Sequence, residues 1–285
     1  MGSPSTAFVK QYQDNITLLA QQMENRLRQT VMVDTNWTGE EKLYDQYATD
    51  DMVEIVSRLE NTPTQSADHR RRKVVPRKFV SNTLEDPFEA LQMLADPKST
   101  YMMAKQASAA RKADLIIIQA ISAAAGTGKT GSTSVTLGSA QKTTNAGGLT
   151  IAKLVEANQI LNAGEVEKED RTLVHSARQM SDLLNSTTAT SIDFNTVKAL
   201  VQGEIDMFLG FKFVQSEQLE TDSADARLCL AYQKKGVQFA IQKEAEGRLD
   251  ERPDKNYAWQ VYMKMVVGAV RLEEARVVQI PCVEA

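Results

Sequence analysis

One long uninterrupted stretch, from Asp96 to Gly126, most constrains what this chain can fold into. Asp96 and Pro97 suit an N-cap and a first helical position, and no further glycine or proline occurs before Gly126. Apolar residues recur at helical spacing at Met103, Ala107, Ala110, Ile117, Ile121 and Ala125. Such a helix is on the order of 40 Å long, more than one face of a compact domain needs. The sequence therefore predicts a long helix against which a larger body of structure packs.

The predicted helix runs into a glycine-rich segment, Ala123–Thr130, with the sequence AAAGTGKT. This segment fits the loose form of a phosphate-binding loop, in which backbone N–H groups, a lysine and a Ser or Thr hold phosphates and Mg²⁺. Such a loop follows a buried strand and opens a helix, whereas this one follows a helix and opens a stretch rich in Ser, Thr and Gly. A nucleotide-binding enzyme that uses Lys129 and Thr130 is therefore the weaker alternative, and Gly126–Gly131 is interpreted as a turn.

The composition is that of an ordinary globular chain, with 285 residues of which 42% are hydrophobic and 25% charged. The formal charge of -4 argues against tight, sequence-independent binding of nucleic acid, which requires many Lys and Arg side chains. Cys229, Cys282 and two histidines are too few for a disulfide scaffold or a Cys/His metal cluster. We expect two inert thiols, no metal and no cofactor, and also no membrane span and no export signal.

Catalytic side chains do not combine into a recognisable site. His175 precedes Ser176, but neither a glycine elbow nor an orienting carboxylate accompanies them. The neighbouring carboxylates at 50–51 and at 273–274 diverge on either regular element, so adjacency makes no acid/base pair. We therefore predict no catalytic residues and no enzymatic activity.

The N-terminal third contains two features that suit contacts with other chains. Apolar residues within 7–31 form one helical stripe, which is either a core helix or an arm that docks on a neighbouring subunit. Residues 50–79 suit an extended, hairpin-like excursion with a basic run, which fits nucleic acid or, as we favour, acidic surface on another chain. The candidates for intersubunit contact are the basic Arg70, Arg71, Arg72 and Lys73, and the acidic Glu165, Glu167, Glu169, Asp170, Asp250 and Glu251.

The remaining segments predict an α+β protein. Helices are expected at 149–163, which Gly164 ends, from the N-cap Ser176 through Leu184, and roughly at 193–202. Strand patterns occupy 172–175, 208–214, 228–232, 237–241, 259–267 and 271–280. The charged segment 243–256 either extends a hairpin or forms its loop. Because the last strands follow one another across short turns, we expect a largely antiparallel sheet without regular βαβ alternation.

The order and spacing of several segments carry a resemblance to a known family. These are the helix 96–125, GGLTIAKLVEA at 147–157, VHSARQMSDLL at 174–184, FLGFKFV at 208–214, the stretch 232–236 and GAVRLEEARVV at 268–278. With them the chain resembles the major capsid proteins of tailed bacteriophages, which have the Hong Kong 97-type fold, and particularly the branch found in short-tailed phages.

The resemblance implies a Hong Kong 97-like capsid fold with a long spine helix. Its expected regions are an N-terminal arm at 1–49, an extended loop at 50–95, a peripheral domain with the spine helix at 96–170, an axial domain at 171–256, and closing strands at 257–285 that return to the peripheral domain. Such subunits would form hexamers and pentamers of an icosahedral head around double-stranded DNA, without sequence-specific DNA binding. Scaffolding, portal or cement proteins would be further partners, and assembly would occur in the host cytoplasm.

An encapsulin-like compartment, which encloses cargo enzymes with the same fold, is the first alternative to a phage head. Some relatives carry covalent Lys–Asn cross-links, but the sequence identifies no such pair. For the basic run, the expectation is that reversing Arg70, Arg71 and Arg72 to Glu blocks assembly without unfolding the subunit.

Overall fold

The computed structural model describes residues 21–35, 37–48, 52–57, 61–62, 64, 69–85, 98–144, 147–185, 207–222 and 225–284. These residues form two compact units: one contains 78–112 and 243–266 with the N-terminal residues up to 25, and the other contains 26–77, 113–242 and 267–285, each as far as described. Three elements, α2 (Lys98–Ser122), β11 (Val237–Arg252) and β12 (Ala258–Arg271), contribute residues to both units. The units therefore do not follow the linear order of the chain.

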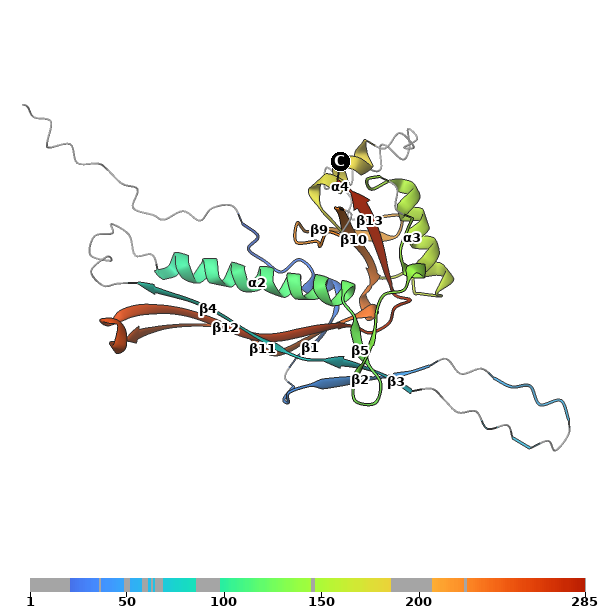
Figure 1. Cartoon of the computed structure of the whole chain (residues 1–285), viewed down its shortest axis with the longest axis horizontal. Helices are drawn as coiled ribbons and strands as arrows, with labels where there is room; N and C mark the ends of the chain where they lie inside the picture. Colours follow the sequence, from blue (N-terminus) through green and yellow to red (C-terminus); the bar gives the residue numbers. More distant parts are fainter. Residues whose placement is uncertain are drawn as a thin grey trace, which may run out of the picture. The chain divides into compact units, whose positions relative to one another are not determined.

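Helix α2 is the long helix that the sequence predicts, and Figure 1 shows it as one continuous coil. Its C-terminal half is the more buried part, with Ile116, Ile117, Ile118 and Ile121 at most 1% exposed. The helix ends at Ser122, earlier than expected, because Ala125 already belongs to a strand. Asp96 and Pro97, the expected start, lie outside the described residues.

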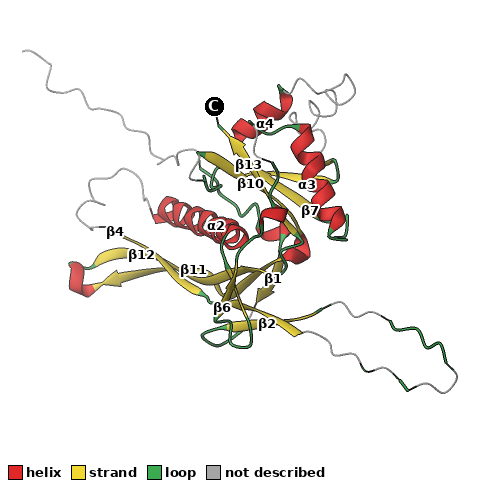
Figure 2. Cartoon of the chain, turned by 45° about the vertical axis from the view of Figure 1, so that its right-hand side comes forward, coloured by secondary structure: helices red, strands yellow, loops and turns green. Residues whose placement is uncertain are grey.

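A five-stranded sheet with the order β13-β10-β7-β9-β8 lies within the larger unit. Its strands are β7 (Arg171–His175), β8 (Met207–Phe208), β9 (Phe211–Gln215), β10 (Ala226–Gln233) and β13 (Val277–Val283). All neighbours are antiparallel except β7 and β9. Figure 2 shows α3 (Ile151–Ala163) beside this sheet, where it contacts β13. The closing residues 277–283 thus share a sheet with strands from 171–233.

The two described helices that follow α2 begin and end where local signals predict. The Thr150 side chain accepts a hydrogen bond from the backbone N–H of Lys153 at the start of α3, and Gly164 is its C-cap. Helix α4 (Ala177–Leu184) starts with a capping box of Ser176 and Gln179. Burial along α3 does not follow polarity throughout, because Lys153 is buried and Val155 is 50% exposed.

A second sheet in the same unit has the order β2-β3-β5-β6 and is antiparallel throughout. Its strands are β2 (Lys42–Tyr47), β3 (His69–Val74), β5 (Ala125–Thr127) and β6 (Thr133–Val135). Strands β2 and β3 form the base of the hairpin-like excursion, which begins before residue 50. Strands β5 and β6 flank a turn within the expected glycine-rich segment, because the chain pairs with β3 directly after α2.

The third sheet has the order β1-β11-β12-β4, with β1 (Met32–Thr35) parallel to the start of β11 and with β4 (Arg77–Glu85) next to β12. Residues 243–252 extend strand β11, which decides between the two alternatives for the charged segment 243–256. The expectation of one largely antiparallel sheet is corrected. Only a short 3₁₀ turn, Lys234–Gly236, separates β10 from β11, yet the two strands belong to different sheets.

Two helical expectations fall largely outside the described residues. Of segment 7–31 only 21–31 is described, and its one helical element is a 3₁₀ turn at Arg28–Thr30, so the described part is not the expected α-helix. The helix expected at 193–202 lies outside the described residues. No helix in the described ranges is long and apolar enough to cross a membrane.

One hydrophobic cluster joins the strands around the basic strand β3. It contains Trp37, Val74, Ala125, Ala240 and Val270, with Tyr44 and Leu272 packed against it. Its members come from β2, β3, β5, β11, β12 and the loops beside them, all within the larger unit. Burial of this apolar surface holds β3 in place and so fixes the positions of the charged side chains that β3 carries.

Candidate functional site at the basic strand

Strand β3 carries the basic run, and strand alternation divides its side chains between two faces. Arg70 and Arg72 point to one face, whereas Arg71 and Lys73 point to the other. Arg72 is only 3% exposed, and Arg70 is exposed. The run is therefore not one uniform basic surface.

Arg71 and Lys73 have carboxylate partners within the chain. Arg71 forms an ion pair with Asp45, which lies directly opposite it on β2. Lys73 forms an ion pair with Glu41, just before the start of β2. Partly exposed pairs of this kind contribute about 0.2–1 kcal/mol each. Their main effect is to favour the register in which β2 and β3 pair.

Arg72 and Arg271 share the carboxylate of Glu274. Nη2 of Arg72 lies 2.7 Å from Oε2 of Glu274, and Nε of Arg271 lies 3.5 Å from Oε1 of the same group. Nε of Arg72 also donates to the carbonyl oxygen of Leu272 over 2.7 Å. Burial lowers the pKa of Arg271, and Glu274 counteracts that shift. One carboxylate thus bridges two buried guanidinium groups.

Arg271 also satisfies the carbonyl groups at the end of α2. Its Nη1 donates to the carbonyl oxygens of Ile121 and Ala123 over 2.6 and 2.9 Å, and its Nη2 donates to that of Val135 over 3.0 Å. The last carbonyl groups of a helix lack partners inside the helix and carry partial negative charge. A buried cation here therefore stabilises both the helix end and the hairpin that follows.

The glycine-rich segment is the turn between β5 and β6. Gly128 and Gly131 have φ angles of 89° and 68°, and the N–H of Gly131 donates to the carbonyl oxygen of Gly128 over 3.1 Å. A Cβ atom on Gly131 would lie 2.4 Å from Cδ of Lys73. Turn conformation and close packing therefore account for these glycines. A phosphate-binding loop needs a helix after the turn, and here strand β6 follows.

The predicted acidic residues lie elsewhere in the described structure. Glu167 pairs with Lys235 at 2.9 Å and with Arg276 at 2.7 Å, and hydrogen bonds from these two residues lower its pKa. The side chains of Glu165, Glu169 and Asp170 are exposed beside it. Asp250 and Glu251 are exposed near the end of β11, in the smaller unit.

The carboxylates that pair with Arg71, Arg72 and Lys73 are Asp45, Glu274 and Glu41, none of which was among the predicted contact residues. The period-two pattern of β2 is the signal that could have placed Asp45 opposite Arg71. Glu274 pairs across a long sequence separation and has no local signal. Within the described part of the chain, no three His, Cys, Asp or Glu side chains gather as metal ligands would.

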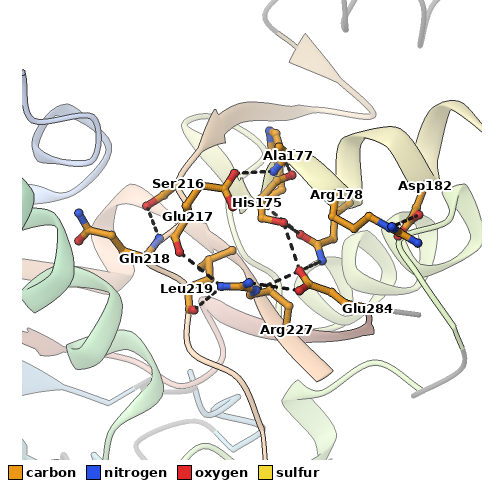
Figure 3. Close-up of polar contacts among 12 residues, drawn as sticks. His175, Ala177, Arg178, Asp182, Ser216, Glu217, Gln218, Leu219, Arg227 and Glu284 are labelled. Atoms are coloured by element: carbon orange, nitrogen blue, oxygen red, sulfur yellow. Dashed lines mark hydrogen bonds and ion pairs between the residues drawn. The ribbon is translucent and has the colours of Figure 1, made fainter. Parts of the chain in front are cut away.

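A second polar network ties the last residues of the chain to α4, as Figure 3 shows. Nε and Nη2 of Arg227 contact the two carboxylate oxygens of Glu284 at 3.0 and 3.2 Å. Glu284 also accepts a hydrogen bond from Nε2 of Gln179 over 2.9 Å. Glu217 accepts from the backbone N–H of Ala177 over 2.7 Å, at the positive end of α4. The network therefore fixes β13 and the start of α4.

The side chains of His175 and Ser176 each contact other groups of the chain. Nδ1 of His175 lies 2.9 Å from the backbone carbonyl oxygen of Ser176, to which it can donate, and the Ser176 hydroxyl contacts Gln179. Burial lowers the pKa of His175. The thiols of Cys229 and Cys282 are buried on the neighbouring strands β10 and β13.

Comparisons with known proteins identify the family. A family model described as phage capsid protein matches residues 5–284. Among solved structures, the capsid of Ralstonia phage GP4 has a TM-score of 0.76 at 12% identity and covers 100% of this chain and 97% of its own. The capsid of cyanophage Pam1 has a TM-score of 0.74 at 10% identity, with 99% and 98% covered. The capsid of cyanophage P-SCSP1u has a TM-score of 0.72 at 15% identity, with 99% and 94% covered.

No curated protein sequence matches this chain. At identities of 10–15% the structural matches show the fold, and they confirm the α+β capsid architecture that the sequence predicts. The family model adds evidence at the level of sequence and spans nearly the whole chain. The chain belongs to the phage capsid protein family.

Proposed function

We propose that this chain is the major capsid protein of a tailed phage. Its copies assemble into hexamers and pentamers of an icosahedral head that encloses double-stranded DNA. The match of the capsid family model to residues 5–284 is the observation that carries this proposal. The formal charge of -4 suits an inner wall that does not hold the genome tightly.

The role is structural, and the chain acts without a cofactor and without catalysing a reaction. It is a component of the virion that assembles in the host cytoplasm, with scaffolding, portal or cement proteins as further partners. We keep the regional division as part of the proposal: an arm at 1–49, an extended loop at 50–95, a peripheral domain at 96–170, an axial domain at 171–256 and closing strands at 257–285.

Charged residues supply part of the contact between copies in this proposal. Arg70 is the basic residue with the greatest exposure on its face of β3, whereas Arg72 is buried against Glu274. The exposed carboxylates of Glu165, Glu169, Asp170, Asp250 and Glu251 are candidate partners on neighbouring copies. Weak pairs suffice because shell symmetry repeats each contact many times.

Electron microscopy of the purified protein tests the function. Closed shells, hexamers or pentamers are the expected result. A stable monomer that binds ATP, and loses that binding in Lys129→Ala, would overturn it. Particles isolated from producing cells separate the two shell functions, since a phage head contains nuclease-resistant double-stranded DNA and an encapsulin-like compartment contains cargo protein.

The contact role of β3 requires a sharper variant than reversal of the whole basic run. Replacing Arg72 by Glu would place two carboxylates together in a buried site, so unfolding would confound the result. Arg70→Glu avoids this and is expected to reduce shell yield while circular dichroism of the dispersed subunit stays unchanged. Lys129→Glu, a charge reversal of the same size on the β5–β6 turn, is the matched control. Equal shell yields from both variants would contradict the role of Arg70.

A further inference from the structure

A hollow of about 340 Å³ lies between β3 and the turn that joins β5 to β6, two neighbouring segments of one sheet. His69, Arg70 and Arg72 of β3 line it, together with Thr127, Gly128 and Thr133, and Thr127 lies next to Arg72 and Thr133 in the sheet. All of these residues belong to the same compact unit. The glycine-rich segment therefore borders the hollow beside the basic strand.

Among the described residues, two arginines and one carboxylate line this hollow. Arg72 is 3% exposed, and the one carboxylate that lines the hollow, Glu274, is shared between Arg72 and Arg271. Nη1 of Arg72 has no hydrogen-bond acceptor among the described residues. A buried donor of a charged group without an acceptor costs free energy that an incoming anion would recover.

The turn between β5 and β6 permits a close approach. Gly128 has no side chain and a φ of 89°, so the backbone of the turn borders the space directly. The hydroxyl-bearing residue Thr133 also lines the hollow. A neighbouring hollow of about 260 Å³ also borders Arg70 and Arg72, but Glu273 and Glu274 both line it. The balance of charge therefore favours an anion in the hollow beside the glycine-rich turn.

We propose that this hollow is an oxyanion site, in which Arg70 and Arg72 hold a carboxylate or phosphate group. Guanidinium groups donate charge-assisted hydrogen bonds to such oxygens, and Nη1 of Arg72 is the donor without an acceptor among the described residues. The anion has two sources with the same chemistry: free inorganic phosphate, or a carboxylate of a second copy. The second source rests on the proposed function, and Asp250 and Glu251 are its candidates because both are exposed at a strand end.

Calorimetric titration of dispersed subunits with inorganic phosphate, and separately with acetate, tests the site at constant ionic strength. Saturable binding of one anion per chain is expected. Arg70→Gln, whose side chain is exposed and whose fold should survive, is expected to bind roughly tenfold more weakly or worse. Lys129→Gln, on the same turn but not lining the hollow, should bind as the unchanged protein does. Equal affinity in Arg70→Gln, or no saturable binding to the unchanged protein, would overturn the site.

Titration of assembled shells then distinguishes the sources. Shells that bind phosphate as the subunits do point to the free ion. Shells that bind none, together with shells of Asp250→Asn/Glu251→Gln that bind it again, point to the carboxylate of a second copy. Shells of that double variant that still bind none exclude these two residues as the source. Subunits that bind phosphate but never assemble would contradict the proposed function, while the proposal of an anion site would still hold.

Discussion

Nη1 of Arg271 donates a hydrogen bond over 2.6 Å to the backbone carbonyl oxygen of Ile121, in the last turn of α2. Arg271 is the last residue of β12 and is completely buried. The same guanidinium reaches Val135 on β6 and the carboxylate of Glu274. One side chain therefore connects the end of the long helix with two sheets and with the basic strand through Glu274.

Replacing Arg271 by Met is expected to lower the free energy of unfolding by about 3–5 kcal/mol, because it leaves the helix carbonyl groups without their donor and Glu274 with one cation fewer. Urea unfolding of dispersed subunits, followed by circular dichroism, measures the loss. Arg248→Met is the matched control: Arg248 has a side chain 56% exposed and pairs only at the surface with Glu246, so about 1 kcal/mol or less is expected. Similar losses in both variants would contradict the role of Arg271.

Gly131→Ala is expected to destabilise the subunit more than Gly147→Ala does. Both glycines have positive φ angles, 68° and 66°, so alanine costs about 1–2 kcal/mol at each from backbone strain. A Cβ on Gly131 also overlaps Lys73, whereas no atom of the described residues lies within 4 Å of one on Gly147. The clash adds about 1–3 kcal/mol at Gly131. Thermal unfolding of the two variants compares them, and equal melting temperatures would show that Lys73 moves aside without cost.

Local signals predicted part of this fold from sequence, and long-range pairing accounts for the rest. The helix ending at Gly164 and the one starting at Ser176 depend on caps within a few residues, so their bounds could be predicted. Strands β5 and β6 are three residues each and contain Gly, Ser and Thr, so no periodic pattern reveals them. The assignment of β10 and β11 to different sheets depends on distant partners.

In the candidate site, too, some features could be predicted from the local sequence and others depend on long-range contacts. The basic run of β3 is visible in the sequence, but its burial is not, because Arg70 and Arg72 are equally charged and differ only in what packs over them. Glu274 lies about 200 residues from Arg72 in the chain, and their ion pair depends on the turn between β12 and β13. The flanks of the glycine-rich turn argued against a phosphate-binding loop, and a strand does follow the turn, while its place beside β3 required the structure.

Stability should fall as the pH drops below about 6.5, the ordinary pKa of histidine, because of His175. Burial lowers the pKa of His175 in the folded state, so the unfolded chain takes up a proton first and is favoured as the pH falls. The effect is at most about 1.4 kcal/mol per pH unit for one group. Urea unfolding between pH 7.5 and 5.5 should therefore show a smaller loss for His175→Gln than for the unchanged protein. Identical slopes would mean that His175 is protonated equally in both states.

Glu284 should also make the folded state less stable as the pH falls, but in a lower pH range than His175. Hydrogen bonds from Arg227 and Gln179 lower the pKa of Glu284 below its ordinary value of 4.5. The contribution of ionised Glu284 to the free energy of unfolding is therefore complete above about pH 4.5. This contribution disappears as the pH falls through the lower pKa that Glu284 has in the folded state.

Glu284→Gln is expected to cost about 1–2 kcal/mol at neutral pH, because the charge-assisted pair with Arg227 is lost. The gap between this variant and the unchanged protein should narrow as the pH drops below 4.5, since protonated Glu284 then resembles Gln. Arg227→Gln should show the same narrowing, and the double variant should lose little more than either single one. A gap that stays constant down to pH 3 would show that Glu284 stabilises β13 by packing and not by its charge.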